Sequence, residues 1–154
     1  MKKKGTLAYI FFLILFGLLL PESITAQTRA VTYVVNSDTD AQDAYIDDGI
    51  CETSIGNGIC TLHAAIQNAN QDGQSSIIQF ASKFQYSLGT SINDDNLPKL
   101  TEDNTTIDGS NKWDYANNRP GVEIECTTCD DILGIESNGN NVLGILFAGA
   151  SNSG

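Results

Sequence analysis

The chain offers few side chains of the types that carry out catalysis. His63 is the only histidine among 154 residues. It directly follows Leu62 and lies off the apolar stripe of a predicted helix, so we expect it to be half-exposed and neither catalytic nor metal-binding. A Ser-His-Asp arrangement would have to include it, and the sequence has no Gly-x-Ser-x-Gly segment to present a nucleophilic serine. We therefore predict no catalytic and no cofactor-binding residue.

Acidic residues occur in short clusters whose oxygen atoms are of the type that calcium binds. The clusters are Asp38/Asp40/Asp43, Asp47/Asp48, Asp94/Asp95, Glu102/Asp103 and Asp130/Asp131. None has the spacing of an EF-hand loop. We expect solvated turns, with calcium binding as the alternative and no metal ligand assigned.

One polar segment combines two cations with two aromatic side chains. Lys112 and Arg119 are of the type that neutralises an acidic sugar, and Trp113 and Tyr115 are of the type that stacks on sugar rings. These four are the candidate sugar-contacting residues. The alternative is a solvated loop with an aromatic side chain tucked against the sheet.

The first 26 residues have the composition of a signal peptide. Three lysines, an apolar run over residues 7–20 and a small residue before the expected cut, Ala26, occur in that order. The apolar run has 14 residues, which is shorter than the roughly 20 that a membrane-spanning helix needs. A retained N-terminal anchor is the alternative.

The charge of the remaining chain excludes several partners. Residues 27–154 contain five basic and 18 acidic residues, a formal charge of −13. Such a surface repels nucleic acid and anionic membranes, and no second apolar segment follows that is long enough to cross a bilayer. We predict a secreted or outer-cell-surface protein whose mature chain does not insert into membranes.

Four cysteines in an exported chain favour disulfides over zinc binding. Three pairings are possible. Cys51 and Cys60 are the favoured pair because the segment between them is a turn-rich loop, which leaves Cys126 to Cys129. Closing the first loop contributes about 2–3 kcal/mol in the chain-entropy model. The Cys-x-x-Cys spacing also occurs in redox pairs, but the acidic residues around it disfavour a thiolate.

Short segments rich in β-branched and aromatic residues predict strands at residues 31–35, 77–80, 86–88, 105–109, 122–126, 132–135 and 141–147. Residues after Thr61, a good N-cap, predict a helix instead, because Leu62, Ala65, Ile66 and Ala69 form one apolar stripe. A helix of about ten residues is not stable alone in water. Its apolar stripe must therefore cover another part of the protein.

Two architectures fit short strands without helices between them: an antiparallel sandwich and a parallel β-helix. Residues 104–109 recur loosely 36 positions later, at 140–145, which favours the β-helix. The position of the amphipathic helix favours it too, because the open end of a solenoid needs a lid with a polar outer face. Gln67, Asn68 and Asn70 give the helix such a face.

The segment from Cys60 to Asn70, Cys-Thr-Leu-His-Ala-Ala-Ile-Gln-Asn-Ala-Asn, resembles the CSLREA motif, Cys-Ser/Thr-Leu-Arg-Glu-Ala-Ile followed by Ala-Asn. Further blocks resemble the family in order: residues 34–37, 38–40, 48–51, 58–60, 77–80, 97–100 and 106–109. His63 and Ala64 replace the Arg and Glu of the motif, so we expect any ion pairing by those charges to be absent. The resemblance implies an N-terminal module of a pectin-lyase-like β-helix in exported or surface proteins of bacteria. It implies no reaction.

These patterns predict a mainly β protein. We expect a signal peptide over residues 1–26, an N-terminal cap over 27–75 with a capping helix and a disulfide-stapled turn, and the first coils of a right-handed parallel β-helix over 76–154. Because the sequence ends in a polar turn, we expect a truncated β-helix, that is, a fragment of a longer protein. The predicted role is non-catalytic: structural, adhesive, or in contact with carbohydrate or another cell-surface ligand. The alternative is the start of a polysaccharide lyase or glycoside hydrolase whose active site lies beyond residue 154.

Overall fold

The computed structural model describes residues 29–88, 97–126, 129 and 131–149. Within these ranges, seven strands, one α-helix and one short 3-10 helix follow one another along the chain. In order they are β1 (Val31–Val35), α2 (Leu62–Ala69), β2 (Ser76–Phe80), β3 (Phe84–Ser87), β4 (Thr106–Asp108), η1 (Ser110–Lys112), β5 (Val122–Glu125), β6 (Asn141–Leu143) and β7 (Ile145–Ala148). The predicted signal peptide, Asp94, Asp95 and Asp130 lie outside the described residues.

Neighbouring strands in both described sheets run parallel. One sheet has four strands in the order β1-β2-β4-β6, and the other has three in the order β3-β5-β7. The register places Ile78 of β2 between Tyr33 of β1 and Ile107 of β4. The antiparallel sandwich considered from the sequence is therefore wrong.

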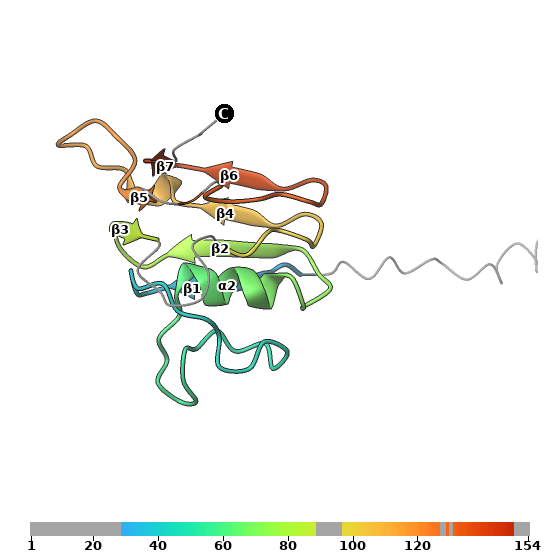
Figure 1. Cartoon of the computed structure of the whole chain (residues 1–154). Coiled ribbons are helices and arrows are strands. Elements are labelled where there is room, and N and C mark those ends of the chain that lie inside the picture. Colours follow the sequence, from blue (N-terminus) through green and yellow to red (C-terminus); the bar gives the residue numbers. More distant parts are fainter. Residues whose placement is uncertain (1–28, 89–96, 127–128, 130, 150–154) are drawn as a thin grey trace, which may run out of the picture.

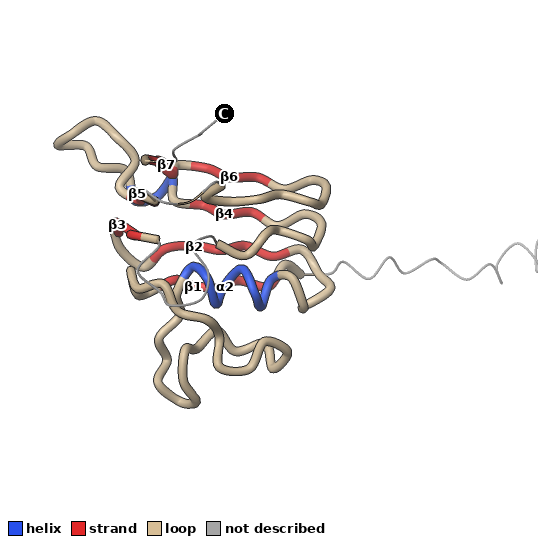
Figure 2. Tube along the Cα trace, viewed as in Figure 1, coloured by secondary structure: helices blue, strands red, loops and turns tan. Residues whose placement is uncertain are grey.

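From β2 onward the chain alternates between the two sheets. β2, β4 and β6 join the four-stranded sheet, whereas β3, β5 and β7 join the three-stranded sheet. Each pair of successive strands, such as β4 and β5, lies beside the preceding pair, β2 and β3, as Figure 1 and Figure 2 show. The segment that leaves one sheet, enters the other and returns supplies the long crossover that parallel strands require.

The core is built from side chains at alternate positions of the strands. In β2, Ser76, Ile78 and Phe80 are buried, and the two residues between them are half-buried. In β5, Val122 and Ile124 are buried in the same way. A period of two is the mark of a strand with one face in the core. The apolar side chains among them belong to one hydrophobic cluster that spans both sheets and α2.

Two predicted strands differ from the observed ones. Residues 132–135 form no strand, and Ile135 makes only a single parallel bridge with Leu100. Residues 141–147, predicted as one strand, are divided into β6 and β7 by Gly144, whose φ is +64°. Because glycine adopts this left-handed conformation without steric cost, one apolar run turns a corner and supplies a strand to each sheet.

The repeat noted in the sequence is offset by 35 residues rather than 36. Thr106 of β4 pairs with Asn141 of β6 (141 − 106). Asn104 is therefore equivalent to Gly139 and not, as predicted, to Asn140. Asn104 and Gly139 have similar left-handed backbones, with φ of 61° and 70°. Equivalent turns precede β4 and β6.

Tyr86 in β3 is the largest of the fully buried side chains, at 1% exposure. Its ring centroid lies 6.1 Å from that of Phe80 and 5.6 Å from that of Phe84. The hydroxyl group is buried and has no hydrogen-bond partner among the described residues. Burial, and then the charge of Asp38, raises the pKa of Tyr86 above its ordinary value. The folded protein therefore favours the neutral phenol.

We expect Tyr86→Phe to be as stable as the wild type at neutral pH, or up to about 2 kcal/mol more stable, because a buried polar group without a partner is removed. The pKa of Tyr86 is higher in the folded state than in the unfolded state, so wild-type stability falls as the pH rises above about 10. The variant should lose less stability over that range. Urea titrations at neutral and alkaline pH measure this, with Tyr115→Phe, at a side chain 87% exposed, as the control. A clear loss of stability at neutral pH would show that the hydroxyl is hydrogen-bonded.

Candidate functional site

Helix α2 begins at a cap that also fixes the preceding loop. The Oγ1 of Thr61 accepts a hydrogen bond from the backbone N–H of Ala64 at 3.0 Å, which satisfies one of the free donors of the first turn. The same hydroxyl donates to the carbonyl oxygen of Ala41 at 2.5 Å. One side chain therefore joins the start of α2 to a loop residue 20 positions earlier.

The inner side of α2 lies on the first two strands. Its four apolar stripe residues are at most 1% exposed: Leu62, Ala65, Ile66 and Ala69. They belong to one hydrophobic cluster with inward-facing side chains of β1 and β2: Tyr33, Val35, Ile78 and Phe80. Among the described elements, α2 contacts β1 and β2. The stripe therefore covers the core at the β1 end of the four-stranded sheet.

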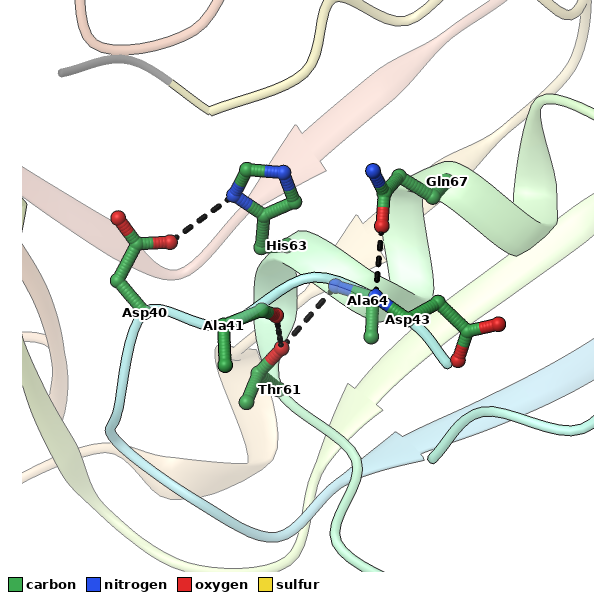
Figure 3. A network of polar contacts seen from close by, with 7 residues as sticks. All are labelled: Asp40, Ala41, Asp43, Thr61, His63, Ala64 and Gln67. Atoms are coloured by element: carbon green, nitrogen blue, oxygen red, sulfur yellow. Dashed lines mark hydrogen bonds and ion pairs between the residues drawn. The ribbon is translucent and has the colours of Figure 1, made fainter. Parts of the chain in front are cut away.

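The outer side of α2 is also buried, beneath residues 40–43 (Figure 3). The Nδ1 of His63 lies 3.0 Å from Oδ1 of Asp40, and the backbone N–H of Asp43 donates to Oε1 of Gln67 at 2.8 Å. Seven of the eight helix residues are buried, and Gln67 is half-buried. The helix thus lies between the strand core on one side and this loop on the other.

Two expectations about this helix are wrong. His63, expected to be half-exposed, is 4% exposed, and Asn68, expected on a polar outer face, is 1% exposed. At the position of the motif arginine, the Nδ1 of His63 instead contacts Asp40. The reason is that the acidic segment does not form a solvated turn at Asp40: it folds back over α2, and the Asp40 side chain is only 3% exposed.

The loop before α2 is held by its own carboxylates, of which sequence reasoning singled out Asp43 but not Glu52. Glu52 is 8% exposed, and both of its carboxylate oxygens lie 2.8 Å from the backbone N of Gly56, which donates to them. Oδ1 of Asp43 accepts from the backbone N–H of Glu52 at 2.9 Å. The Asp43 contact joins residues nine positions apart and the Glu52 contact residues four apart, so neither is the two-residue Asx turn that local composition indicates.

Both disulfides that the sequence favours are present. Cys51 is bonded to Cys60, directly before α2, and Cys126 is bonded to Cys129, directly after β5. Both cysteines of the second pair are 1% exposed. Because a reactive redox pair must be accessible, this burial favours a structural staple.

The four candidate sugar-contacting residues lie in one loop, residues 110–121, but they do not converge. Tyr115 is 87% exposed and Arg119 is exposed, whereas Lys112 and Trp113 are half-buried. The loop is a turn closed by a hydrogen bond from the backbone N–H of Asp114 to the carbonyl oxygen of Arg119 at 2.8 Å. Figure 1 shows it projecting outward between η1 and β5.

A shallow cavity of about 210 Å³ lies at the base of this loop, and of the four candidates only Arg119 lines it. Its charged groups are paired with one another: Lys83 Nζ lies 3.0 Å from Asp114 Oδ1, and Arg119 Nη1 lies 3.1 Å from Glu123 Oε2. Hydrogen bonds from Asn117 and then Lys83 lower the pKa of Asp114 to about 2. The two cations of the cavity are thus engaged by carboxylates of the protein.

No group of three or more His, Cys, Asp or Glu side chains in the described ranges has an arrangement that would hold a metal ion. In that same part of the chain, no helix has the length and apolar character needed to cross a bilayer. The features with the most organised chemistry are therefore the covered helix α2 and the loop that covers it. Comparisons with protein-family models, with curated proteins and with solved structures found no match for this chain.

Proposed function

We propose that the chain is the N-terminal cap and the first coils of a right-handed parallel β-helix with a non-catalytic, structural or adhesive role. The alternation of strands between two parallel sheets supports the β-helix, because each coil then contributes one strand to each sheet. The hand is supported by a general rule, since crossovers between parallel strands of one sheet are almost always right-handed.

The burial of α2 beside β1 is the observation that carries this proposal. The open end of a β-helix would expose both an apolar core and an unpaired strand edge, and both promote association. Here the apolar stripe of α2 covers the core, while residues 40–43 bury the outer side of the helix. A helix covered on both sides presents the loop, and not its own apolar residues, to solvent.

We also propose that this cap is of the CSLREA type and that the protein is exported. The segment that resembles the motif, residues 60–70, forms α2 and its two ends, directly after the Cys51–Cys60 disulfide. Two disulfides favour an oxidising compartment, and the pattern of residues 1–26 favours a signal peptide. The exposed ring of Tyr115 supports contact with carbohydrate as an adhesive role.

The substitution Ala65→Glu tests the cap, and Gln67→Glu, two positions along the same helix, is its matched control. Ala65 is fully buried, whereas Gln67 is half-buried and accepts a hydrogen bond that a glutamate oxygen can also accept. A buried, unpaired carboxylate costs several kcal/mol, so α2 should leave its place in Ala65→Glu. We expect this variant to associate at concentrations where the wild type and Gln67→Glu are monomers, as measured by size-exclusion chromatography with light scattering.

Circular dichroism separates loss of the cap from loss of the whole fold, because the β signal should persist in Ala65→Glu. A monomeric variant with an unchanged β spectrum would contradict the capping role. Turnover of an acidic polysaccharide by the wild-type chain would overturn the non-catalytic role.

A further inference from the structure

Two positions in the sequence have asparagine directly before glycine: Asn57 with Gly58, and Asn138 with Gly139. At such a pair the backbone nitrogen of the glycine can attack the side-chain Cγ of the asparagine, because glycine has no Cβ to hinder the approach. All four residues are exposed, so solvent reaches both pairs. Any difference in their reactivity must therefore come from the contacts that each pair makes.

The peptide group between Asn57 and Gly58 is not held by hydrogen bonds. Neither the carbonyl oxygen of Asn57 nor the N–H of Gly58 has a hydrogen-bond partner among the described residues. Apart from its chain neighbours, no atom lies within 4 Å of the position that a Cβ on Gly58 would take. The loop that contains the pair, between β1 and α2, extends away from the stacked strands in Figure 1. The attacking nitrogen is therefore unpaired and unobstructed.

Both polar atoms of the Asn57 side chain make hydrogen bonds that suit an attack on its Cγ. Oδ1 accepts from the backbone N–H of Ile59 at 2.9 Å, and Nδ2 donates to Oγ1 of Thr53 at 3.0 Å. The first contact stabilises the negative charge that develops on Oδ1 when the amide is attacked. The second places a hydroxyl beside the nitrogen that has to leave, where it can pass on a proton.

The second pair is held between two stacked turns. The backbone N–H of Asn104 donates to the carbonyl oxygen of Asn138 at 2.9 Å, and the N–H of Asn138 donates to Oδ1 of Asp103 at 2.7 Å. A Cβ atom on Gly139 would lie only 2.4 Å from Oδ1 of Asn104. Ring closure turns the peptide group between asparagine and glycine. At this pair, closure therefore breaks a backbone hydrogen bond to the turn before β4.

We propose that Asn57 is a site of spontaneous covalent modification and that the fold protects Asn138. The nitrogen of Gly58 loses its proton and bonds to Cγ of Asn57, while the bond from Cγ to Nδ2 breaks and ammonia leaves with that proton. Water then adds to one carbonyl carbon of the succinimide ring, which opens to aspartate or isoaspartate. Nothing is oxidised or reduced. The product adds one negative charge to the loop that the Cys51–Cys60 disulfide closes.

Hydroxylamine tests the site, because it opens a succinimide ring and cuts the chain between the asparagine and the glycine. The probe is added to the folded, oxidised chain at mildly alkaline pH, and the pieces are separated on denaturing gels. A cut after Asn57 falls between Cys51 and Cys60, so its two pieces separate only when the disulfide is reduced. A cut after Asn138 releases a C-terminal piece without reduction, because no cysteine follows it.

We expect the cut after Asn57 to be about five- to a hundredfold faster than the cut after Asn138, the factor that corresponds to one lost backbone hydrogen bond. Peptide mapping by mass spectrometry, without hydroxylamine, should show deamidation in the same order. In concentrated urea with the disulfides reduced, the contacts that distinguish the pairs are lost, and both pairs should react at similar rates.

Two variants serve as controls. Asn57→Gln, whose longer side chain cannot close the five-membered ring, should abolish the cut that requires reduction and leave the circular dichroism spectrum unchanged. Thr53→Val, which keeps the shape of the side chain and removes its hydroxyl, should slow the reaction at Asn57 and leave that at Asn138 unchanged.

Equal rates at the two pairs in the folded chain, or a faster reaction at Asn138, would overturn the inference. A reaction at Asn57 that occurs only in urea would show that the loop protects this residue. An unchanged rate in Thr53→Val would exclude the hydroxyl from the reaction. The modification does not depend on the role of α2 as a cap, so these results leave the association test of Ala65→Glu unaffected.

Discussion

Replacing Ile66 by alanine is expected to destabilise the fold by about 2–5 kcal/mol, whereas the same replacement at Ile55 is expected to change stability by less than about 0.5 kcal/mol. Ile66 is fully buried in α2, and Ile55 is 74% exposed in the loop between the first two cysteines. Both substitutions remove the same atoms, so their difference isolates the packing of α2 on the strands.

The loss at Ile66 should be large because α2 has only eight residues. A helix of that length is not stable in water by itself, and its tertiary contacts decide whether it forms. Urea unfolding followed by circular dichroism gives both free energies of unfolding. Equal values for Ile66→Ala and Ile55→Ala would mean that α2 does not pack on β1 and β2.

Local periodicity was sufficient to predict the elements that build the core. The β-branched and aromatic residues of 77–80 predicted β2, the alternation of apolar and acidic residues in 122–126 predicted β5, and the stripe from Leu62 to Ala69 predicted α2. These patterns work because burial selects residue type at spacings of two for a strand and three or four for a helix. Parallel pairing depended on weaker arguments, namely one loose repeat and the position of an amphipathic helix suited to cap the open end of a solenoid.

The cover over the outer side of α2 could not be predicted in the same way. Asp40 and His63 are 23 residues apart, and an aspartate in a polar segment has the same composition whether it is solvated or folded over a helix. Nothing in the local pattern distinguishes Asp40, which is buried, from Asp38, which is exposed. Contacts between a loop and a helix are set by tertiary structure alone.

A cavity of about 300 Å³ at the C-terminal end of α2, lined among others by Asp47, Asn68 and Asp72, was missed for a related reason. Asp47 and Asp48 were noted as an acidic cluster, but Asp72 and Asn68 join them only after the loop folds back along the helix. The sequence assigned Asn68 to a solvent-facing surface. Its side-chain oxygen, which is buried and has no hydrogen-bond partner among the described residues, could not be identified without the tertiary structure.

The offset of the repeat shows how identity of residue type can mislead. Matching Asn104 to Asn140 gives 36 residues, yet the register is 35 because the backbone at Asn104 corresponds to that at Gly139. The shape of a turn is set by the φ and ψ angles of its residues, and asparagine and glycine both adopt the left-handed region. With the correct offset, Gly109 becomes equivalent to Gly144.

The corners that contain these two glycines pack directly on each other. The backbone N–H of Gly109 donates to the carbonyl oxygen of Leu143 at 2.8 Å. A Cβ atom on Gly144 would lie 2.7 Å from the carbonyl carbon of Gly109 and would overlap the backbone of Ser110. Gly56 has a similar φ, +72° against +64°, but no atom lies within 4 Å of its Cβ position. The pair Gly144 and Gly56 thus separates backbone strain from steric overlap.

We expect Gly144→Ala to cost about 2–5 kcal/mol, because a left-handed backbone strains alanine by about 1–2 kcal/mol and overpacking adds about 1–3 kcal/mol. Gly56→Ala should cost only the strain, about 1–2 kcal/mol. Urea unfolding of the two variants measures the difference between them. The overlap exists only if the corner at Gly144 rests on the corner at Gly109. Equal losses of stability in the two variants would therefore mean that these corners are not in contact. The stacking of β4 and β6 would then have to be abandoned.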